Sequence, residues 1–208
     1  NNVGNIEVVA AQSLQLAGDT AFVNRGELQI EAGGELQFLD QMYGALDADN
    51  NPIVAEIGPT FTQLDGITTV DGVLDLDTTT NYEIEFAGGV LEGGGEVLAA
   101  VMNNGATVAP GNTANPLGTL TIDQTYVQSI TGQLQIRING ATSSYLSVGA
   151  PVVLAGELRV VLNTTPMIDD SFEIMAHTGR TGEFGSVTVE MFDGTPVDDF
   201  TFDITYDD

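Results

Sequence analysis

Two short stretches decide the fold: Gly132-Gln133-Leu134-Gln135-Ile136 and Gly156-Glu157-Leu158-Arg159-Val160. Each begins with glycine and then alternates polar with apolar residues, a period of two that is typical of a strand with one buried face. The form Gly-x-Leu-x-apolar occurs four more times, beginning at Gly26, Gly34, Gly72 and Gly118. Six copies in one chain indicate an internal repeat.

The spacing of these copies is irregular, from eight residues between Gly26 and Gly34 to twenty-four between Gly132 and Gly156. A solenoid tolerates such variation because each coil contacts only its neighbours, so loops of different length can leave a common framework. Glycine at the start of each strand supplies the conformation or the close backbone approach that a corner needs. We therefore expect an all-β protein, a β-solenoid whose leucines point into one continuous core. Only residues 96–102 have some helical character.

The chain divides into two parts that differ in the spacing of their apolar strands. We expect solenoid coils over residues 1–165, less regular over residues 1–104, and a C-terminal cap or edge strands over residues 166–208. The second part carries widely spaced apolar strands, with Phe172 and Ile174 in one and Phe200, Phe202, Ile204 and Tyr206 in another. A solenoid needs ends that differ from its middle, since an exposed coil edge invites uncontrolled pairing. The last strand could cap its own stack or add to a neighbour's sheet.

The charge is extreme. Thirty acidic residues stand against four arginines and no lysine, which gives a formal net charge of -26. Nucleic acid is excluded as a partner, because a phosphate backbone is bound by clustered Lys and Arg. The same reasoning disfavours anionic membrane surfaces. Salt or divalent cations would relieve the self-repulsion, so a saline or calcium-containing medium is expected.

Cysteine is absent, so the chain has no disulfide, no thiolate nucleophile and no Cys-type metal site. No apolar run reaches the roughly 18 residues that a membrane-spanning helix requires, and we expect no transmembrane segment.

From Gly105 onward the chain resembles the β-helical repeat regions of bacterial autotransporter passengers and related exported proteins. The residues that carry the resemblance are Val108-Ala109-Pro110-Gly111-Asn112, Leu117-Gly118-Thr119-Leu120-Thr121-Ile122, Tyr126-Val127-Gln128, Gly132-Gln133-Leu134-Gln135-Ile136, the stretch from Val152 to Val160, Asp170-Ser171-Phe172-Glu173-Ile174 and Gly182-Glu183-Phe184. An insertion at residues 112–116 departs from the pattern. The resemblance implies a right-handed parallel β-helix, export, and a place outside the cell or on its surface, but no particular ligand.

We interpret the residues that could act in catalysis as structural or surface residues. His177 is the only histidine and lies in a turn-like stretch, and the serines Ser143, Ser144 and Ser171 have no Gly-x-Ser-x-Gly elbow. The adjacent pairs Asp169-Asp170 and Asp198-Asp199 could supply an acid and a base only in loops, because neighbours on a strand point to opposite faces. We expect no catalytic residue, no enzymatic activity and no required cofactor.

One stretch has a metal-like pattern. Asp47-Ala48-Asp49-Asn50-Asn51 places oxygen ligands at alternate positions, as Ca²⁺ prefers, so Asp47, Asp49 and Asn51 form a candidate calcium site. The stretch is not an EF-hand, since Pro52 and Gly58 stand where that loop requires Gly and Glu. An acidic turn without metal is the alternative.

Three classes of function remain: a self-associating structural protein, a carbohydrate- or surface-binding adhesin-like module, and a β-helix polysaccharide lyase or hydrolase. A sugar-binding module would show exposed aromatics, but Trp is absent, and only a row of Tyr43, Tyr126 and Tyr145 on one face would favour it. We expect the first class: an extracellular structural module that contacts itself or other surface proteins. The candidate assembly edge is Phe200, Phe202, Ile204 and Tyr206.

Overall fold

The chain forms a β-solenoid. The computed structural model describes residues 1–17, 21–39, 44–46, 52–54, 60–76, 83–167, 169–197 and 201–206, and these contain no helix. Three parallel sheets run along the stack, one on each side of the coil. The predicted all-β solenoid is confirmed.

Sheet 1 contains β1 (Asn5–Val8), β4 (Glu27–Ile30), β9 (Ile67–Val70), β12 (Val90–Gly93), β15 (Thr107–Pro110), β18 (Gln133–Asn139), β22 (Glu157–Leu162) and β25 (Ser186–Met191). Sheet 2 contains β2 (Ser13–Ala17), β5 (Glu35–Leu39), β10 (Val73–Leu76), β13 (Glu96–Leu98), β16 (Thr119–Ile122), β20 (Tyr145–Val148) and β23 (Met175–Ala176). Sheet 3 contains β3 (Ala21–Asn24), β8 (Thr60–Gln63), β11 (Glu83–Phe86), β14 (Ala100–Asn103), β17 (Tyr126–Gln128), β21 (Val152–Leu154) and β24 (Arg180–Gly182). Short antiparallel pairs are made by β6 (Gly44–Leu46) with β7 (Pro52–Val54), and by β19 (Thr142–Ser143) with β18.

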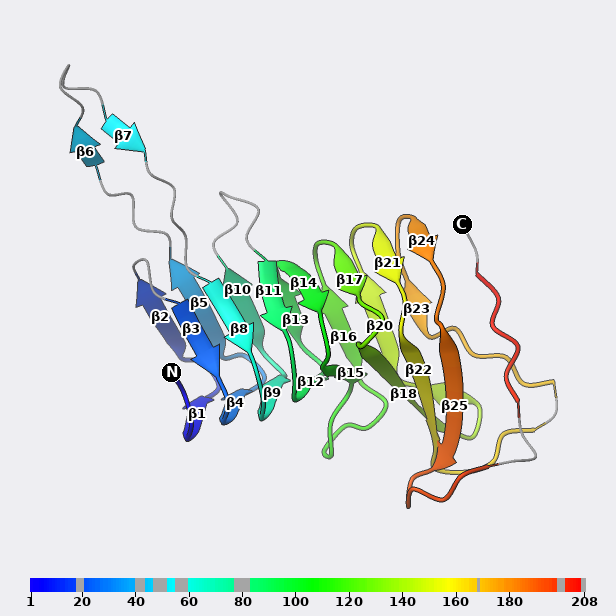
Figure 1. Cartoon of the computed structure of the whole chain (residues 1–208). Helices are drawn as coiled ribbons and strands as arrows, with labels where there is room; N and C mark the ends of the chain where they lie inside the picture. The colour runs from blue at the N-terminus through cyan, green and yellow to red at the C-terminus, as the bar shows by residue number, and fades with distance from the viewer. Residues whose placement is uncertain are drawn as a thin grey trace.

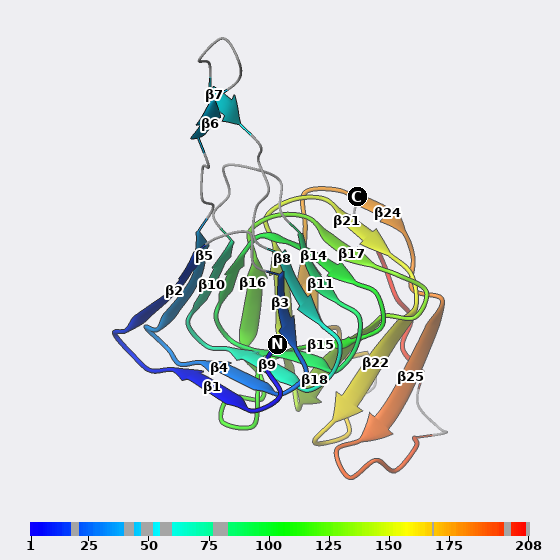
Figure 2. The ribbon, with the colours of Figure 1, turned by 60° about the vertical axis from the view of Figure 1, so that its left-hand side comes forward.

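The chain passes through the three sheets in the same order in every coil, and β25 begins a further coil after β24 (Figure 1). Seen from the N-terminal end, it runs clockwise through sheets 1, 2 and 3 while it recedes from the viewer (Figure 2). The β-helix is therefore right-handed.

One continuous apolar core fills the interior, and the leucines of the repeat lie in it. The six repeat leucines are each at most 1% exposed: Leu28, Leu36, Leu74, Leu120, Leu134 and Leu158. In-register pairing places equivalent residues on top of one another, as with Leu134 and Leu158. The polar residues between them face outward, which confirms the predicted alternation.

The six repeat copies belong to two different corners of the coil. Three of them open strands of sheet 1, at Gly26, Gly132 and Gly156, and three open strands of sheet 2, at Gly34, Gly72 and Gly118. The eight residues from Gly26 to Gly34 therefore span one side of a coil. The twenty-four from Gly132 to Gly156 span one complete coil, which explains the irregular spacing.

A column of buried side chains, mostly amides, follows the corner where sheet 3 ends, with Phe86 of β11 between Gln63 and Asn103. Asn24, Gln63, Asn103 and Gln128 occupy the last positions of their strands and are at most 1% exposed. Gln128 Nε2 donates to the backbone carbonyls of Gly132, Ala155 and Glu157 at 3.2, 2.7 and 3.0 Å. The amides thus satisfy backbone groups that the corner removes from the ladder.

The structure adds two details to the sequence prediction. Residues 96–102, whose helical character was too short to predict a helix, lie in β13 and β14, and each strand pairs with a parallel strand on either side. The solenoid also does not stop at residue 165. β23, β24 and β25 pair in parallel with β20, β21 and β22, so much of the expected cap is a regular continuation of the three sheets.

Candidate functional site

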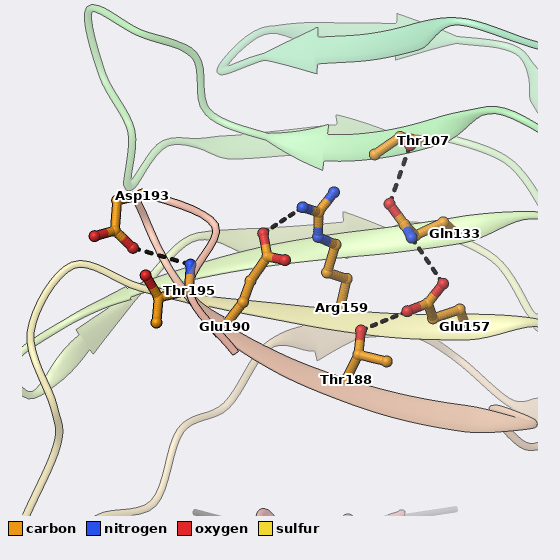
Figure 3. Close-up of polar contacts among 8 residues, drawn as sticks. All are labelled: Thr107, Gln133, Glu157, Arg159, Thr188, Glu190, Asp193 and Thr195. Atoms are coloured by element: carbon orange, nitrogen blue, oxygen red, sulfur yellow. Dashed lines mark hydrogen bonds and ion pairs between the residues drawn. The ribbon is translucent and has the colours of Figure 1, made fainter. Parts of the chain in front are cut away.

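A ladder of polar side chains crosses the outer face of sheet 1 (Figure 3). Thr107 Oγ1 donates to Gln133 Oε1 at 3.1 Å, and Gln133 Nε2 donates to Glu157 Oε2 at 2.8 Å. The other carboxylate oxygen of Glu157 accepts from the hydroxyl of Thr188. These residues come from β15, β18, β22 and β25, so the ladder links four successive coils and satisfies its own donors.

An ion pair runs beside this ladder. Arg159 on β22 binds the carboxylate of Glu190 on β25 (Figure 3). Both side chains are partly exposed, so the pair adds little stability by itself. The guanidinium of Arg159 is therefore bound to a carboxylate on the neighbouring strand, β25.

An open groove of about 480 Å³ borders the ladder at the corner between sheets 3 and 1. Thr107, Gln133 and Glu157 line it, together with the corner backbone at Gly132 and Gly156. Ile130, 85% exposed, lines it as well. The groove contains hydrogen-bonding groups and one large apolar side chain.

A second polar cluster lies near the corner between sheets 1 and 2. Asn112 Nδ2 donates to both carboxylate oxygens of Asp71, at 2.9 and 2.7 Å, which fastens the loop inserted between β15 and β16. Burial raises the pKa of nearby Glu92, and the positive charge of Arg137 only partly offsets this. Within the described residues, no group of three or more His, Asp or Glu side chains is placed to hold a metal ion.

The C-terminal end of the stack is covered by its own chain. Phe202, Ile204 and Tyr206 pack against the core. The ring of Phe202 lies 6.2 Å from that of Phe172, and the guanidinium of Arg180 lies 4.3 Å from the ring centre of Tyr206. In Figure 1 this segment runs along the end of the stack next to β25.

This segment is not a strand, contrary to the prediction. Residues 201–206 belong to no strand, and their apolar side chains pack against the core. Cavities of about 550 and 480 Å³ lie along them. The edge of β25 is itself partly paired, since the amide of Val197 donates to the carbonyl of Val189 at 3.3 Å. The described part of the predicted assembly edge, Phe202, Ile204 and Tyr206, is thus engaged within the molecule.

The side chains of the first coil, β1 to β3, are less buried than those of the coils that follow. β1, β2 and β3 are the terminal strands of the three sheets. Leu14 is 37% exposed, and Ile6, Leu16 and Phe22, which pack against the core, are only half-buried. The amide of Asn2 donates to the carbonyl of Val23 at 2.8 Å and so covers the last part of β3.

Among the described residues, no hydrogen bond joins two of the residues considered for catalysis. His177 lies between β23 and β24 and lines one cavity of the C-terminal end, Asp169 and Asp170 line the other, and Ser171 lines both. The carboxylate of Asp170 accepts from the amide of Met167 at 2.8 Å, which is a turn contact. Ser144 is buried and accepts from the amide of Arg137 at 3.0 Å.

The tyrosine row that would favour sugar binding does not form. Tyr126 is fully buried, and its hydroxyl donates to Gln128 Oε1 at 2.7 Å. The hydroxyl of Tyr145 donates to a carboxylate oxygen of Glu173 at 2.9 Å, and burial together with this carboxylate raises the pKa of Tyr145 to about 12.

Several predicted residues lie outside the described part of the chain: Tyr43, the calcium candidates Asp47, Asp49 and Asn51, the pair Asp198-Asp199, and Phe200. The calcium site therefore stays a prediction. The sequence reasoning missed the polar ladder of sheet 1, although a signal for it existed: Gln133 and Glu157 occupy the same position in two copies of the repeat.

Comparison of the chain with protein-family models, with curated proteins and with solved structures finds no match. The described residues contain no helix long and apolar enough to cross a membrane. The site geometry and the charge are therefore the basis for a functional proposal.

Proposed function

We propose that this protein is a non-enzymatic extracellular structural module that acts by association, with itself or with other surface components. The observation that carries the proposal is the repetitive stack of in-register parallel strands, a framework to which further strands can add by main-chain hydrogen bonds.

The edge of a sheet offers a row of backbone donors and acceptors to any passing strand. Strand addition, in which main-chain hydrogen bonds join two sheets, is therefore a mode of association that a stack of parallel strands allows.

The charge supports a location where salt is present. At -26 per chain, copies repel one another unless ions screen them, with a Debye length of about 8 Å at physiological ionic strength. Outside the cell, sodium and calcium would provide that screening. The resemblance to exported β-helical repeat regions agrees with this location.

Light scattering across protein concentration and NaCl concentration tests the proposal, with negative-stain images of the same samples. We expect a mass above the 21.8 kDa of one chain, rising with salt. A parallel series with calcium at matched ionic strength separates screening from bridging. A chain that stays monomeric at the highest protein, salt and calcium concentrations would contradict self-association.

A carbohydrate-binding module is the second candidate, and the groove beside the polar ladder is the observation that favours it. Its carboxylate and lack of cations suit a neutral sugar better than an acidic one. Titration calorimetry with a neutral oligosaccharide such as cellohexaose tests this function. Gln133→Ala should abolish binding, whereas Gln135→Ala, on the same strand but outside the groove, should not; no heat of binding to the wild type would exclude this ligand.

A further inference from the structure

We propose that the outer face of sheet 3 packs against the same face of a second copy of this chain, in a two-fold dimer in which β17 lies against β17 of the other copy. This inference rests on the proposed function, because it names the surface and the partner for the association described above. It concerns one of the three outer faces, in the part of the stack where coils lie on both sides.

The surface consists of outward side chains on β14, β17 and β21, which lie side by side in sheet 3 (Figure 2). Register pairs Met102 with Val127 and Val127 with Val153, so these three side chains form a row along the stack. Val153 is 39% exposed, and the other two are half-buried. The residues two positions earlier form a second outward row: Ala100, Thr125 and Pro151. We call these six residues the sheet 3 patch.

The sheet 3 patch carries no charge, in a chain with thirty acidic residues and four arginines. The other two outer faces do carry charges on the coils of β14 and β21. Sheet 1 has Glu92 on β12 and Arg137 on β18, and sheet 2 has Glu96 on β13. Two copies with a charge of -26 each meet with the least repulsion where both faces are neutral, which selects this patch for contact between copies.

The shape of the patch suits face-to-face packing of sheets, in which the side chains of two faces interdigitate. Most of its side chains are small or β-branched and form an even surface. Burial of Met102, Val127 and Val153 against apolar partners is favourable, because it removes apolar surface from water.

The area of the contact makes the dimer weak. The outer face of the five strands from β11 to β24 measures about 24 Å by 13 Å, from a strand spacing of about 4.8 Å and a rise of about 3.3 Å per residue. Stable dimers bury about 800 Å² per partner, which is more than this face provides. We therefore expect the dimer to form at high protein concentration and in salt.

Charge on the neighbouring strand β11 decides which two-fold axis relates the copies. An axis along the stack would place β11 against β11, so Glu83 and Glu85 of the two copies would repel each other. An axis along the strands reverses the stack and places β11 against β24. In that arrangement Glu85 faces Thr181, whose hydroxyl can donate to the carboxylate.

The position of the axis follows from the row of apolar side chains. With the axis over β17, Val127 faces Val127 of the other copy, and Met102 faces Val153. Every member of the row then meets an apolar partner. An axis over β14 would instead set the carboxylate of Glu85 against Val127 and would bury its charge on an apolar side chain.

A new charge on the patch tests the contact. Val127→Asp should raise the dissociation constant of the dimer by at least about tenfold, because the charge is desolvated against its own copy. Val153→Asp, at a more exposed position, should act in the same direction. Thr121→Asp adds the same charge to the outer face of sheet 2 and should leave the dimer unchanged. Sedimentation at several protein concentrations measures the constant, and melting curves show that each variant is folded.

Cross-linking tests the arrangement independently, because the natural chain contains no cysteine. A short bismaleimide can span the roughly 10 Å between packed sheets. Val127→Cys should therefore give a covalent dimer on denaturing gels, whereas Thr121→Cys should stay monomeric. A mixture of Met102→Cys and Val153→Cys chains should cross-link more than either variant alone. Equal cross-linking of Met102→Cys by itself would overturn the axis along the strands.

The possible results separate this inference from the proposed function. In high salt we expect the wild type to approach a mass twice 21.8 kDa, and Val127→Asp to keep the mass of one chain. A larger mass that persists in both Val127→Asp and Val153→Asp, without cross-linking of Val127→Cys, would overturn the sheet 3 contact and leave association standing. A wild type that is monomeric at every protein and salt concentration would overturn self-association as well.

Discussion

Gly72 stacks directly on Gly34 at the corner between sheets 1 and 2: a Cβ atom built on Gly72 would stand 2.2 Å from the carbonyl oxygen of Gly34. The same relationship recurs one coil further on, where a Cβ on Gly95 would stand 2.2 Å from the carbonyl oxygen of Gly72. The glycines of the repeat are thus required because backbone of one coil touches backbone of the next.

Gly72→Ala should therefore destabilise the protein by about 1–3 kcal/mol, because the contact is with backbone that can move only if the coil moves. The backbone φ of Gly72 is not positive, so a loss of stability in Gly72→Ala comes from the steric contact and not from backbone strain. Gly179→Ala is the matched control, since a Cβ there meets nothing within 4 Å. Urea unfolding of both variants measures the difference, and equal stabilities would contradict close stacking of the corners.

Gln128→Leu should destabilise the protein by at least about 2 kcal/mol, because buried carbonyls of Gly132, Ala155 and Glu157 lose their donor. The hydroxyl of Tyr126 also loses its acceptor. Gln29→Leu makes the same chemical change on the exposed outer face of β4 and should have little effect. Thermal unfolding compares the two, and a Gln128→Leu variant as stable as Gln29→Leu would show that the amide column is dispensable.

Glu92→Gln should stabilise the protein slightly at pH 7, raising the melting temperature by about 1–3 °C. Burial raises the pKa of Glu92 above its ordinary value of 4.5. The folded state therefore binds this proton more tightly than the unfolded state does. Protonated Glu92 therefore contributes to the free energy of unfolding at pH values below its unfolded pKa, and this contribution is lost as the pH rises through its folded pKa.

The gain from Glu92→Gln should accordingly disappear at pH values below 4.5. Glu27→Gln removes one charge from an exposed position on the same sheet and controls for the general relief of repulsion. Melting curves from acid to neutral pH provide the measurement. A Glu92→Gln gain that equals that of Glu27→Gln at every pH would assign the effect to net charge alone.

The melting temperature should rise with NaCl, because screening weakens repulsion within a chain of charge -26. If Asp47, Asp49 and Asn51 hold calcium, Ca²⁺ should raise it further at equal ionic strength, and the double variant Asp47→Asn, Asp49→Asn should lose only that additional rise. Identical curves in Ca²⁺, Mg²⁺ and NaCl of matched ionic strength would leave screening as the whole explanation.

The sequence by itself determined the strands and the core, because both follow from local properties. Alternation with a period of two places Leu134 and Leu158 inside and Gln133 and Glu157 outside in any sheet with one buried face. Glycine before a strand likewise marks a corner wherever the coil turns. The expected burial of the repeat leucines needed no knowledge of their partners.

Only the tertiary structure decided how these pieces are placed. Copies of the repeat look alike in sequence, yet Gly26 opens a strand of sheet 1 and Gly34 opens a strand of sheet 2. This assignment depends on the number of residues between corners and on which strands pair. The C-terminal segment alternates like a strand, yet residues 201–206 form none, because covering the open core outweighs pairing with an edge.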